Sequence, residues 1–378
     1  MYISGVGRTK FGPLAESLPQ LLYEAVSKAL EDAGIGIEDL DAAYVANFCA
    51  GPFVGQLHLN SLVASLLPGT HIPIVRIETA CASGASALFQ AGLALGRFET
   101  VLVAGVEKMS NLQGPAVSTN IGMAGDAELD APAGLTFPAS YALITSSHMA
   151  EHGSTLDDLS LVSLKNHGNA RLNPLAHFYH KRVTLDDING SATVCSPLRL
   201  FDCSPISDGA AALIVSRERR SDRDVQVIAS ALATDTLSLA ERDSVTSFTA
   251  ARMAATQAYG QAGVGPKEID VVEVHDCFTI MELIALEDLG FCRTGEGKDL
   301  VREGRTSRSG DIPTNVDGGL KADGHPIGAS GIAQIFELVT QLRGEAGPRQ
   351  VPGAVTGLAH NIGGVGGTCG VHILRKDN

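Results

Sequence analysis

The sequence predicts an α/β fold built from two duplicated halves, with an extra region inserted into the first half. Two short segments each occur twice: residues 33–41 resemble residues 262–270, and residues 81–86 resemble residues 325–330. The copies lie 229 and 244 residues apart, which indicates that one structural unit has been repeated. Strand-like apolar runs alternate with helical periods in both halves, which favours parallel sheets covered by helices.

A third, weaker match locates the insertion. Residues 209–215 resemble residues 367–373, but these copies are only 158 residues apart, so the first half carries extra chain before residue 209. Within the extra chain, residues 113–137 are rich in Gly, Ala and Pro and are predicted to be a loop, whereas residues 145–172 are predicted to be helical. We therefore predict a first half, an insertion and a second half at residues 1–114 plus 200–220, 115–199 and 221–378.

The first half leads to a cysteine placed between a strand and a helix. Residues 21–33 have helical periodicity, and Gly34 follows them as at many helix C-termini. Cys81 lies between the strand-like run 72–77 and the helical run 87–95. A helix N-terminus favours a thiolate, so we expect a lowered pKa and a nucleophilic sulfur at Cys81. The alternative is a structural cysteine, because free cysteine is often buried.

The duplication bears on this alternative. Cys81 and His325 begin equivalent copies, and each opens a helix of small residues. Packing the halves around a pseudo-twofold axis would bring the two helix starts together, and with them a nucleophile and a base. A structural cysteine does not explain this pairing, so the pattern favours a catalytic role.

Composition narrows the possible partners. The formal net charge of −14 argues against nucleic acid and anionic membranes as partners. No apolar run reaches the roughly 18 residues that a membrane-spanning helix needs. The first residues show no basic leader, so we expect a cytoplasmic protein whose seven cysteines are reduced. The cysteine spacing shows no metal-binding pair, so we expect no metal site.

Five stretches of the sequence stand out as a set. They are Cys81 with its small-residue helix, Ser-Asp-Gly-Ala-Ala-Ala at 207–212, His-Asp-Cys-Phe at 275–278, Gly-His-Pro at 324–326 and Asn-Ile-Gly-Gly at 361–364. Together they resemble the thiolase family, and the resemblance covers essentially the whole chain.

Two positions depart from the commonest pattern of that family. Most thiolases have Asn-Glu-Ala-Phe where this chain has His-Asp-Cys-Phe, and most have a second catalytic cysteine where this chain has Asn361. Both departures resemble the sterol-carrier-protein-X type and the archaeal and bacterial acetoacetyl-CoA thiolases.

The resemblance implies the thiolase fold, with five layers in the order α-β-α-β-α, and a set of catalytic roles. Cys81 would attack a carbonyl and become acylated, and His325 would take its proton. Cys277 would move the proton at the α-carbon of the second acetyl group. His275 would serve a first oxyanion hole, and the backbone N–H groups of Cys81 and Gly363 would form a second.

The resemblance also implies a binding surface for coenzyme A, which would be a substrate and product and not a permanently bound cofactor. Ser204 is expected to contact it, and the insertion at 115–199 to carry much of the surface. Lys181 and Arg182 could pair with its phosphates, although solvated surface charge is an equal alternative for both. His360 and Asn361 are expected at the substrate, although His360 could equally support the glycine-rich turn.

The resulting interpretation is an acyl-CoA C-acyltransferase that makes or cleaves acetoacetyl-CoA through an acylated Cys81. The alternatives are a longer-chain 3-ketoacyl-CoA thiolase of lipid or sterol degradation, a thiolase-like aldolase, and a non-catalytic acyl-CoA-binding protein. The family implies a homodimer or homotetramer. Its archaeal branch adds a small partner protein and a hydroxymethylglutaryl-CoA synthase.

Overall fold

The computed structural model describes residues 1–376 and contains a nine-stranded sheet with strand order β3-β2-β4-β7-β1-β8-β11-β10-β9. The first half contributes β1 (Tyr2–Arg8), α1 (Leu18–Ala33), β2 (Ala42–Ala46), α2 (Ala50–Val54), α3 (Leu59–Ala64), β3 (Ile74–Ile77), α4 (Ser83–Ala94), β4 (Thr100–Glu107) and β7 (Gly209–Ser216). The second half contributes β8 (Val225–Thr234), α9 (Thr249–Ala262), β9 (Val271–Glu273), α10 (Thr279–Asp288), α11 (Gly297–Arg302), α12 (Gly319–Ala322), α13 (Ile327–Leu342), β10 (Thr356–Gly363) and β11 (Thr368–Arg375).

The two halves have the same topology. In the first half the strand order is β3-β2-β4-β7-β1, and in the second it is β9-β10-β11-β8. A single parallel bridge between Val272 and Thr314 stands where the second half would have its fifth strand. The halves join where the start of β1 pairs antiparallel with β8, through Tyr2 with Gln226 and Ile3 with Val225.

Both halves of the sheet are mixed, so the expectation of parallel sheets was wrong. In the first half, β2 is parallel to β3 and β4, whereas β7 is antiparallel to both of its neighbours, β4 and β1. In the second half, β10 is parallel to β9 and antiparallel to β11. Only four residues separate β10 from β11, and a connection this short can join only antiparallel strands.

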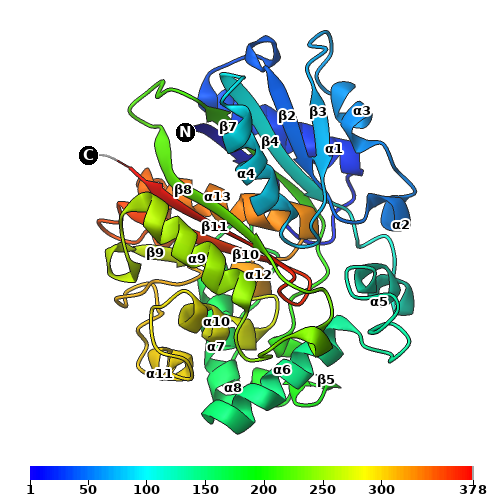
Figure 1. Ribbon diagram of the computed structural model, residues 1–378, viewed down its shortest axis with the longest axis vertical. Coiled ribbons are helices and arrows are strands. Elements are labelled where there is room, and N and C mark those ends of the chain that lie inside the picture. Colours follow the sequence, from blue (N-terminus) through cyan, green and yellow to red (C-terminus); the bar gives the residue numbers. More distant parts are fainter. Residues whose placement is uncertain (377–378) are drawn as a thin grey trace.

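The elements form the five layers expected from the thiolase resemblance (Figure 1). Helices α1 and α3 cover the outer face of the first half's strands, and α9 covers the outer face of the second half's strands. Helices α4 and α13 pack against each other between the two sets of strands and contact both. The small-residue helices that the sequence placed after Cys81 and His325 are therefore the central layer.

Glycine explains why the two central helices can approach so closely. A Cβ atom added to Gly84 of α4 would lie 2.8 Å from the backbone nitrogen of Ile332. One added to Gly331 of α13 would lie 2.8 Å from the backbone nitrogen of Ala85. Side chains at these two positions would force the helices apart, and with them the residues at their N-termini.

The other duplicated segment is also a structural repeat. Helices α1 and α9 end at equivalent glycines, Gly34 and Gly263, whose φ angles are 66° and 65°. A left-handed conformation at this position is natural for glycine and closes the helix. A short 3₁₀ turn and then a strand, β2 or β9, follow in each half.

Residues 115–199 add no strand to the nine-stranded sheet. They form α5 (Pro115–Gly122), α6 (Phe137–His152), α7 (Leu156–Ala170), α8 (Leu185–Asn189) and a small hairpin of β5 (Thr193–Cys195) with β6 (Leu198–Arg199). Helices α6, α7 and α8 lie together at the bottom of Figure 1. The loop expected over 113–137 contains α5, and the helix expected over 145–172 is two helices separated by Gly153, which caps α6 with a φ of 71°.

None of the helices in residues 1–376 combines the length and apolar character needed to cross a membrane.

Candidate active site

Cys81, His275 and His325 meet at one point in the molecule. The cysteine sulfur and one ring nitrogen of each histidine lie within 4.8 Å of one another. Cys81 lies two residues before α4, His325 two residues before α13, and His275 two residues after β9. The two helix starts therefore come together, as the duplication predicted.

A cavity of about 460 Å³ opens over this cluster. Cys81, His325 and Cys277 line it, so two thiols and an imidazole face the same space. Most of the remaining wall is apolar and comes from all parts of the chain, including Phe48, Met109, Val117, Phe137, Ile206, Phe278 and Ile327. Such a wall excludes water from the reacting groups and strengthens their electrostatic interactions.

The expectation of a lowered pKa at Cys81 was wrong. Burial raises the pKa of this thiol to about 12, and the nearby carboxylates Glu107 and Glu78 act in the same direction. The backbone N–H groups of Gly364 and of Cys81 itself point at the sulfur and offset only part of this effect. Loss of water around a buried sulfur outweighs the helix N-terminus. Cys81 therefore rests as a thiol and would need a base in order to act as a nucleophile.

His325 has the tautomer that such a base requires. Ser330 donates its hydroxyl proton to the carbonyl of Pro326 at 2.9 Å, so its oxygen accepts from Nδ1 of His325 at 2.7 Å. Nε2 of His325 is then unprotonated. Burial lowers the pKa of His325 to about 3, so the ring is neutral near pH 7 and can accept the Cys81 proton.

His275 has the opposite tautomer. The Asn361 amide donates to Nδ1 of His275 at 3.0 Å, so the ring proton is on Nε2. Burial, with His325 and His360 nearby, holds the pKa of His275 well below its usual range. Within residues 1–376, the buried Nε2 atom of His275 has no hydrogen-bond partner. A neutral N–H donor without a partner beside Cys81 is suited to an oxyanion.

Cys277 provides the second thiol. It is 6% exposed, and its own carbonyl accepts a hydrogen bond from the Ser204 backbone at 2.9 Å. Burial, followed by the proximity of Cys81, raises the pKa of Cys277 well above its usual range. Phe48, the residue at the equivalent position in the first half, also lines the cavity, so in this register the first half supplies an apolar side chain and no thiol.

The predicted binding residues occupy different places. Ser204 lines the cavity, whereas His360 and Asn361 are buried behind His275; the His360 ring accepts the His275 backbone N–H at 3.5 Å. Lys181 and Arg182 are exposed and outside the cavity, and the Lys181 ammonium packs over the rings of Phe178 and Phe201.

The glycine-rich turn after β10 differs in detail from the expectation. Gly363 lines a neighbouring pocket, which it shares with Glu78 and Thr79, and it is Gly364 that faces the main cavity and points its N–H at the Cys81 sulfur. A Cβ atom at Gly363 would lie 2.4 Å from the Thr79 carbonyl. The turn therefore needs glycine in order to lie this close to Cys81.

Several further residues support the cluster. Glu107 accepts the backbone N–H groups of Phe48, Cys49 and Gly328 at 2.9–3.1 Å and so joins loops of both halves. Ser330 fixes the His325 tautomer, and its place in the repeated segment was the one available signal. Tyr141, from the insertion, reaches Gly364 and had no signal in the sequence.

The cluster of Cys81, His275 and His325 also contains thiol and imidazole groups of the kind that bind zinc. The expectation of no metal site rested on cysteine spacing and did not anticipate this group, because its members come from three distant segments. The two tautomers and the apolar cavity are what acyl-group chemistry requires.

Comparison with known proteins agrees with this geometry. The thiolase N-terminal domain family matches residues 1–219, and the thiolase C-terminal domain-like family matches residues 231–376. The chain is 48% identical to an acetyl-CoA acetyltransferase of Methanothermobacter thermautotrophicus, over 99% of both chains. It is 35% identical to human sterol carrier protein 2, over 99% of this chain and 72% of that protein.

A solved structure agrees over the whole molecule. The Ltp2-ChsH2(DUF35) aldolase superposes with a TM-score of 0.86 at 27% identity, over 100% of this chain and 98% of that one. The matched regions include every residue of the cluster and both halves of the duplicated fold. The chain is therefore an enzyme of the thiolase family.

Proposed function

We propose that this enzyme is an acetyl-CoA C-acetyltransferase, which joins two acetyl-CoA molecules reversibly into acetoacetyl-CoA and CoA through an acetyl-Cys81 intermediate. The observation that carries the proposal is that two thiols and an unprotonated imidazole line one cavity, and that a free imidazole N–H lies beside the first thiol. Similarity to the archaeal acetyl-CoA acetyltransferase supports the choice of substrate.

In the first step, Cys81 attacks the thioester carbonyl while Nε2 of His325 takes the thiol proton. The tetrahedral oxygen accepts a hydrogen bond from Nε2–H of His275, which is otherwise without a partner. The carbon–sulfur bond to CoA breaks as the thioester to Cys81 is completed. Because Cys277 starts as a thiol, it can give its proton to the CoA thiolate after the acetyl group has been transferred, and so become a thiolate itself without taking part in loading.

In the second step, the Cys277 thiolate removes a proton from the methyl group of a second acetyl-CoA. The resulting carbanion attacks acetyl-Cys81, and the Cys81 sulfur leaves and regains the proton held by His325. Cys81, Cys277 and His325 all return to their starting forms. The chemistry therefore needs a second thiol near the first, which Cys277 supplies from the other half.

The remaining assignments are part of the same proposal. Ser204, at the cavity wall, would contact the pantetheine arm, and the insertion at 115–199 would carry the CoA surface. Lys181 and Arg182 lie outside the cavity, where only the phosphates of CoA could reach them. A homodimer or homotetramer, the small partner protein and the hydroxymethylglutaryl-CoA synthase are inferences from the family.

Mass spectrometry and steady-state kinetics test the proposal. Acetyl-CoA should add one acetyl group to Cys81, and the enzyme should cleave acetoacetyl-CoA faster than longer 3-ketoacyl-CoA substrates. Faster cleavage of longer chains would favour the thiolase of lipid degradation. Cleavage of carbon–carbon bonds without an acyl-Cys81 would indicate an aldolase. A protein that forms no adduct and cleaves no substrate would be a binding protein.

A further inference from the structure

Tyr141, a residue of helix α6 in the insertion, lies beside the thiols of the proposed active site. Its side chain is fully buried, and its ring stacks on Phe278 with centroids 4.4 Å apart and planes 23° apart. Phe278 directly follows Cys277 in the chain. The stacked ring therefore fixes where the Tyr141 hydroxyl lies relative to the Cys277 sulfur.

The Tyr141 hydroxyl lies between the Gly364 carbonyl and the Cys277 side chain, and it has only one proton to donate. It donates this proton to the Gly364 carbonyl at 2.9 Å, and it lies close enough to the Cys277 sulfur that each group shifts the pKa of the other. Because the hydroxyl proton is taken by the carbonyl, the hydroxyl oxygen is left free to accept from the Cys277 thiol. Through the backbone of Gly364, the same hydroxyl also supports the N–H that points at Cys81.

We propose that Tyr141 is a positioning residue for the α-proton step. Its oxygen orients the Cys277 thiol toward the CoA thiolate that loading has already released, and its proton turns from the Gly364 carbonyl to the Cys277 sulfur when the Cys277 thiolate forms. This inference rests on the proposed function. No bond to Tyr141 forms or breaks: the proton lost by Cys277 goes to the CoA thiolate, and the proton gained later comes from the substrate methyl group.

The surroundings allow this rotation. Burial raises the pKa of Tyr141 well above its usual range, so the hydroxyl remains a donor at every working pH. The titratable or charged groups that influence this hydroxyl or Cys277 are Cys81, Asp276 and Arg242. Among these, only Arg242 favours negative charge nearby. A dedicated neutral donor is therefore valuable to a thiolate that forms between Cys81 and Asp276.

Tyr141→Phe and Tyr259→Phe form a matched pair for the test. Tyr259 of α9 also donates its hydroxyl to a backbone carbonyl, that of Leu289 at 2.9 Å, but lies outside the cavity. Two rates are measured for each variant: acetyl loading of Cys81 by quenched mass spectrometry, and exchange of acetyl-CoA methyl protons with D₂O. Loading should stay within about threefold of wild type in both variants, while exchange falls about 30-fold or more in Tyr141→Phe alone.

Equal losses of loading and exchange in Tyr141→Phe, or exchange within threefold of wild type, would overturn the inference. If Tyr141→Phe does not fold, 3-fluorotyrosine at position 141 replaces it; this residue keeps the ring and hydroxyl but is more acidic. Exchange should then change while loading does not, and an unchanged exchange rate overturns the inference. A wild-type enzyme that neither loads nor exchanges would instead refute the proposed function.

Discussion

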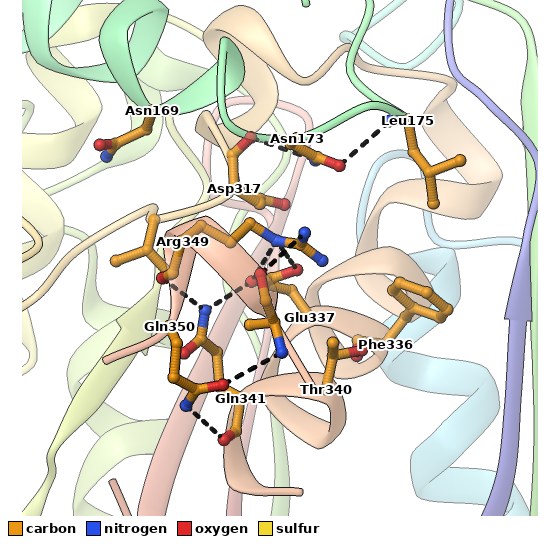
Figure 2. Close-up of polar contacts among 12 residues, drawn as sticks. Asn169, Asn173, Leu175, Asp317, Phe336, Glu337, Thr340, Gln341, Arg349 and Gln350 are labelled. Carbon is orange, nitrogen blue, oxygen red and sulfur yellow. Dashed lines mark hydrogen bonds and ion pairs between the residues drawn. The ribbon is translucent and has the colours of Figure 1, made fainter. Parts of the chain in front are cut away.

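Two buried polar regions of this molecule satisfy their hydrogen bonds very differently. The first joins the second half of α13 to the turn before β10 and is shown in Figure 2. Arg349 contacts both carboxylate oxygens of Glu337 at 2.9 and 3.0 Å, and Gln341 donates to Glu337 at 2.8 Å and to the Arg349 carbonyl at 3.0 Å. Within residues 1–376, no buried side-chain atom of these three residues lacks a partner.

The second region is the catalytic cluster at the other end of α13. There the described residues leave the buried atoms His275 Nε2, His360 Nε2 and Asn361 Oδ1 without partners. An unpaired buried polar atom costs about 1–3 kcal/mol of stability. The fold satisfies the buried ion pair at one end of α13, whereas at the other end the His275 N–H beside Cys81 stays unpaired, as the proposed oxyanion donor requires.

The largest expected effect is on the cluster. Cys81→Ala should lower acetyl transfer by at least about 1,000-fold, because no other group is placed to carry the acyl intermediate. Its melting temperature should stay near that of wild type, since the cavity already borders this side chain. Cys369→Ala, a buried cysteine of β11, is the control and should keep its activity. Substantial thiolysis by Cys81→Ala would contradict the assignment.

Cys277→Ser should separate the two chemical steps. It should still accept an acetyl group on Cys81, yet condense or cleave acetoacetyl-CoA about 100- to 10,000-fold more slowly, because a hydroxyl is a far weaker acid and does not form the anion that removes the α-proton. Intact-mass and steady-state measurements on one preparation give both numbers. Near-normal cleavage would move the α-proton role elsewhere, with His360 or a water at His275 as the next candidates.

Arg349→Met should lower the stability of the fold and leave the activity nearly unchanged, which is the opposite of the effect expected for the cysteine variants. Removing the cation leaves the Glu337 carboxyl buried without its ion-pair partner, which should cost about 3 kcal/mol in urea unfolding. Glu337→Gln with Arg349→Met should recover part of this loss. Per folded molecule, kcat should remain within about twofold of wild type. A large fall in kcat would show that the ion pair also positions His325 at the other end of α13.

The two regions should respond to pH in opposite directions. Burial lowers the pKa values of His325 and His360 to about 3, so the stability they contribute is present above about 6.5 and is lost as pH falls toward 3. Burial raises the pKa of Glu337 to about 7, so its contribution is present below about 4.3 and is lost as pH rises through 7. Melting temperature plotted against pH should therefore fall less steeply on the acid side in His360→Asn, and less steeply on the alkaline side in Glu337→Gln.

The smallest expected effect is that of pH on acetyl loading, whose rate should hardly change near neutrality. The Cys81 pKa of about 12 and the His325 pKa of about 3 both lie far from neutrality, so thiol and imidazole keep their working forms across the usual range. The rate of acetyl loading should therefore vary by no more than about twofold between pH 6 and 8. A tenfold rise per pH unit would mean that attack proceeds from preformed thiolate without help from His325.

The sequence alone determined the duplicated architecture and the partners of the central cluster. Equivalent glycines at 34 and 263 end equivalent helices because a left-handed cap is a local requirement. Close packing of two helices requires small residues, and small residues follow both Cys81 and His325. The repeat therefore predicted that these two side chains would meet. Local conformation and periodic burial leave marks that can be seen without coordinates.

Tertiary structure decided the electrostatics and the supporting residues. The raised pKa of Cys81 results from burial by segments that are distant in the chain. The expectation of a lowered pKa had considered only the helix that directly follows this residue. The direction of β7 relative to β4 was set only after the chain had passed through the whole insertion. Tyr141 reaches Gly364 across 223 positions of sequence, and Lys181 packs on aromatic rings outside the cavity. Such contacts depend on how distant segments fold together, and therefore no local pattern encodes them.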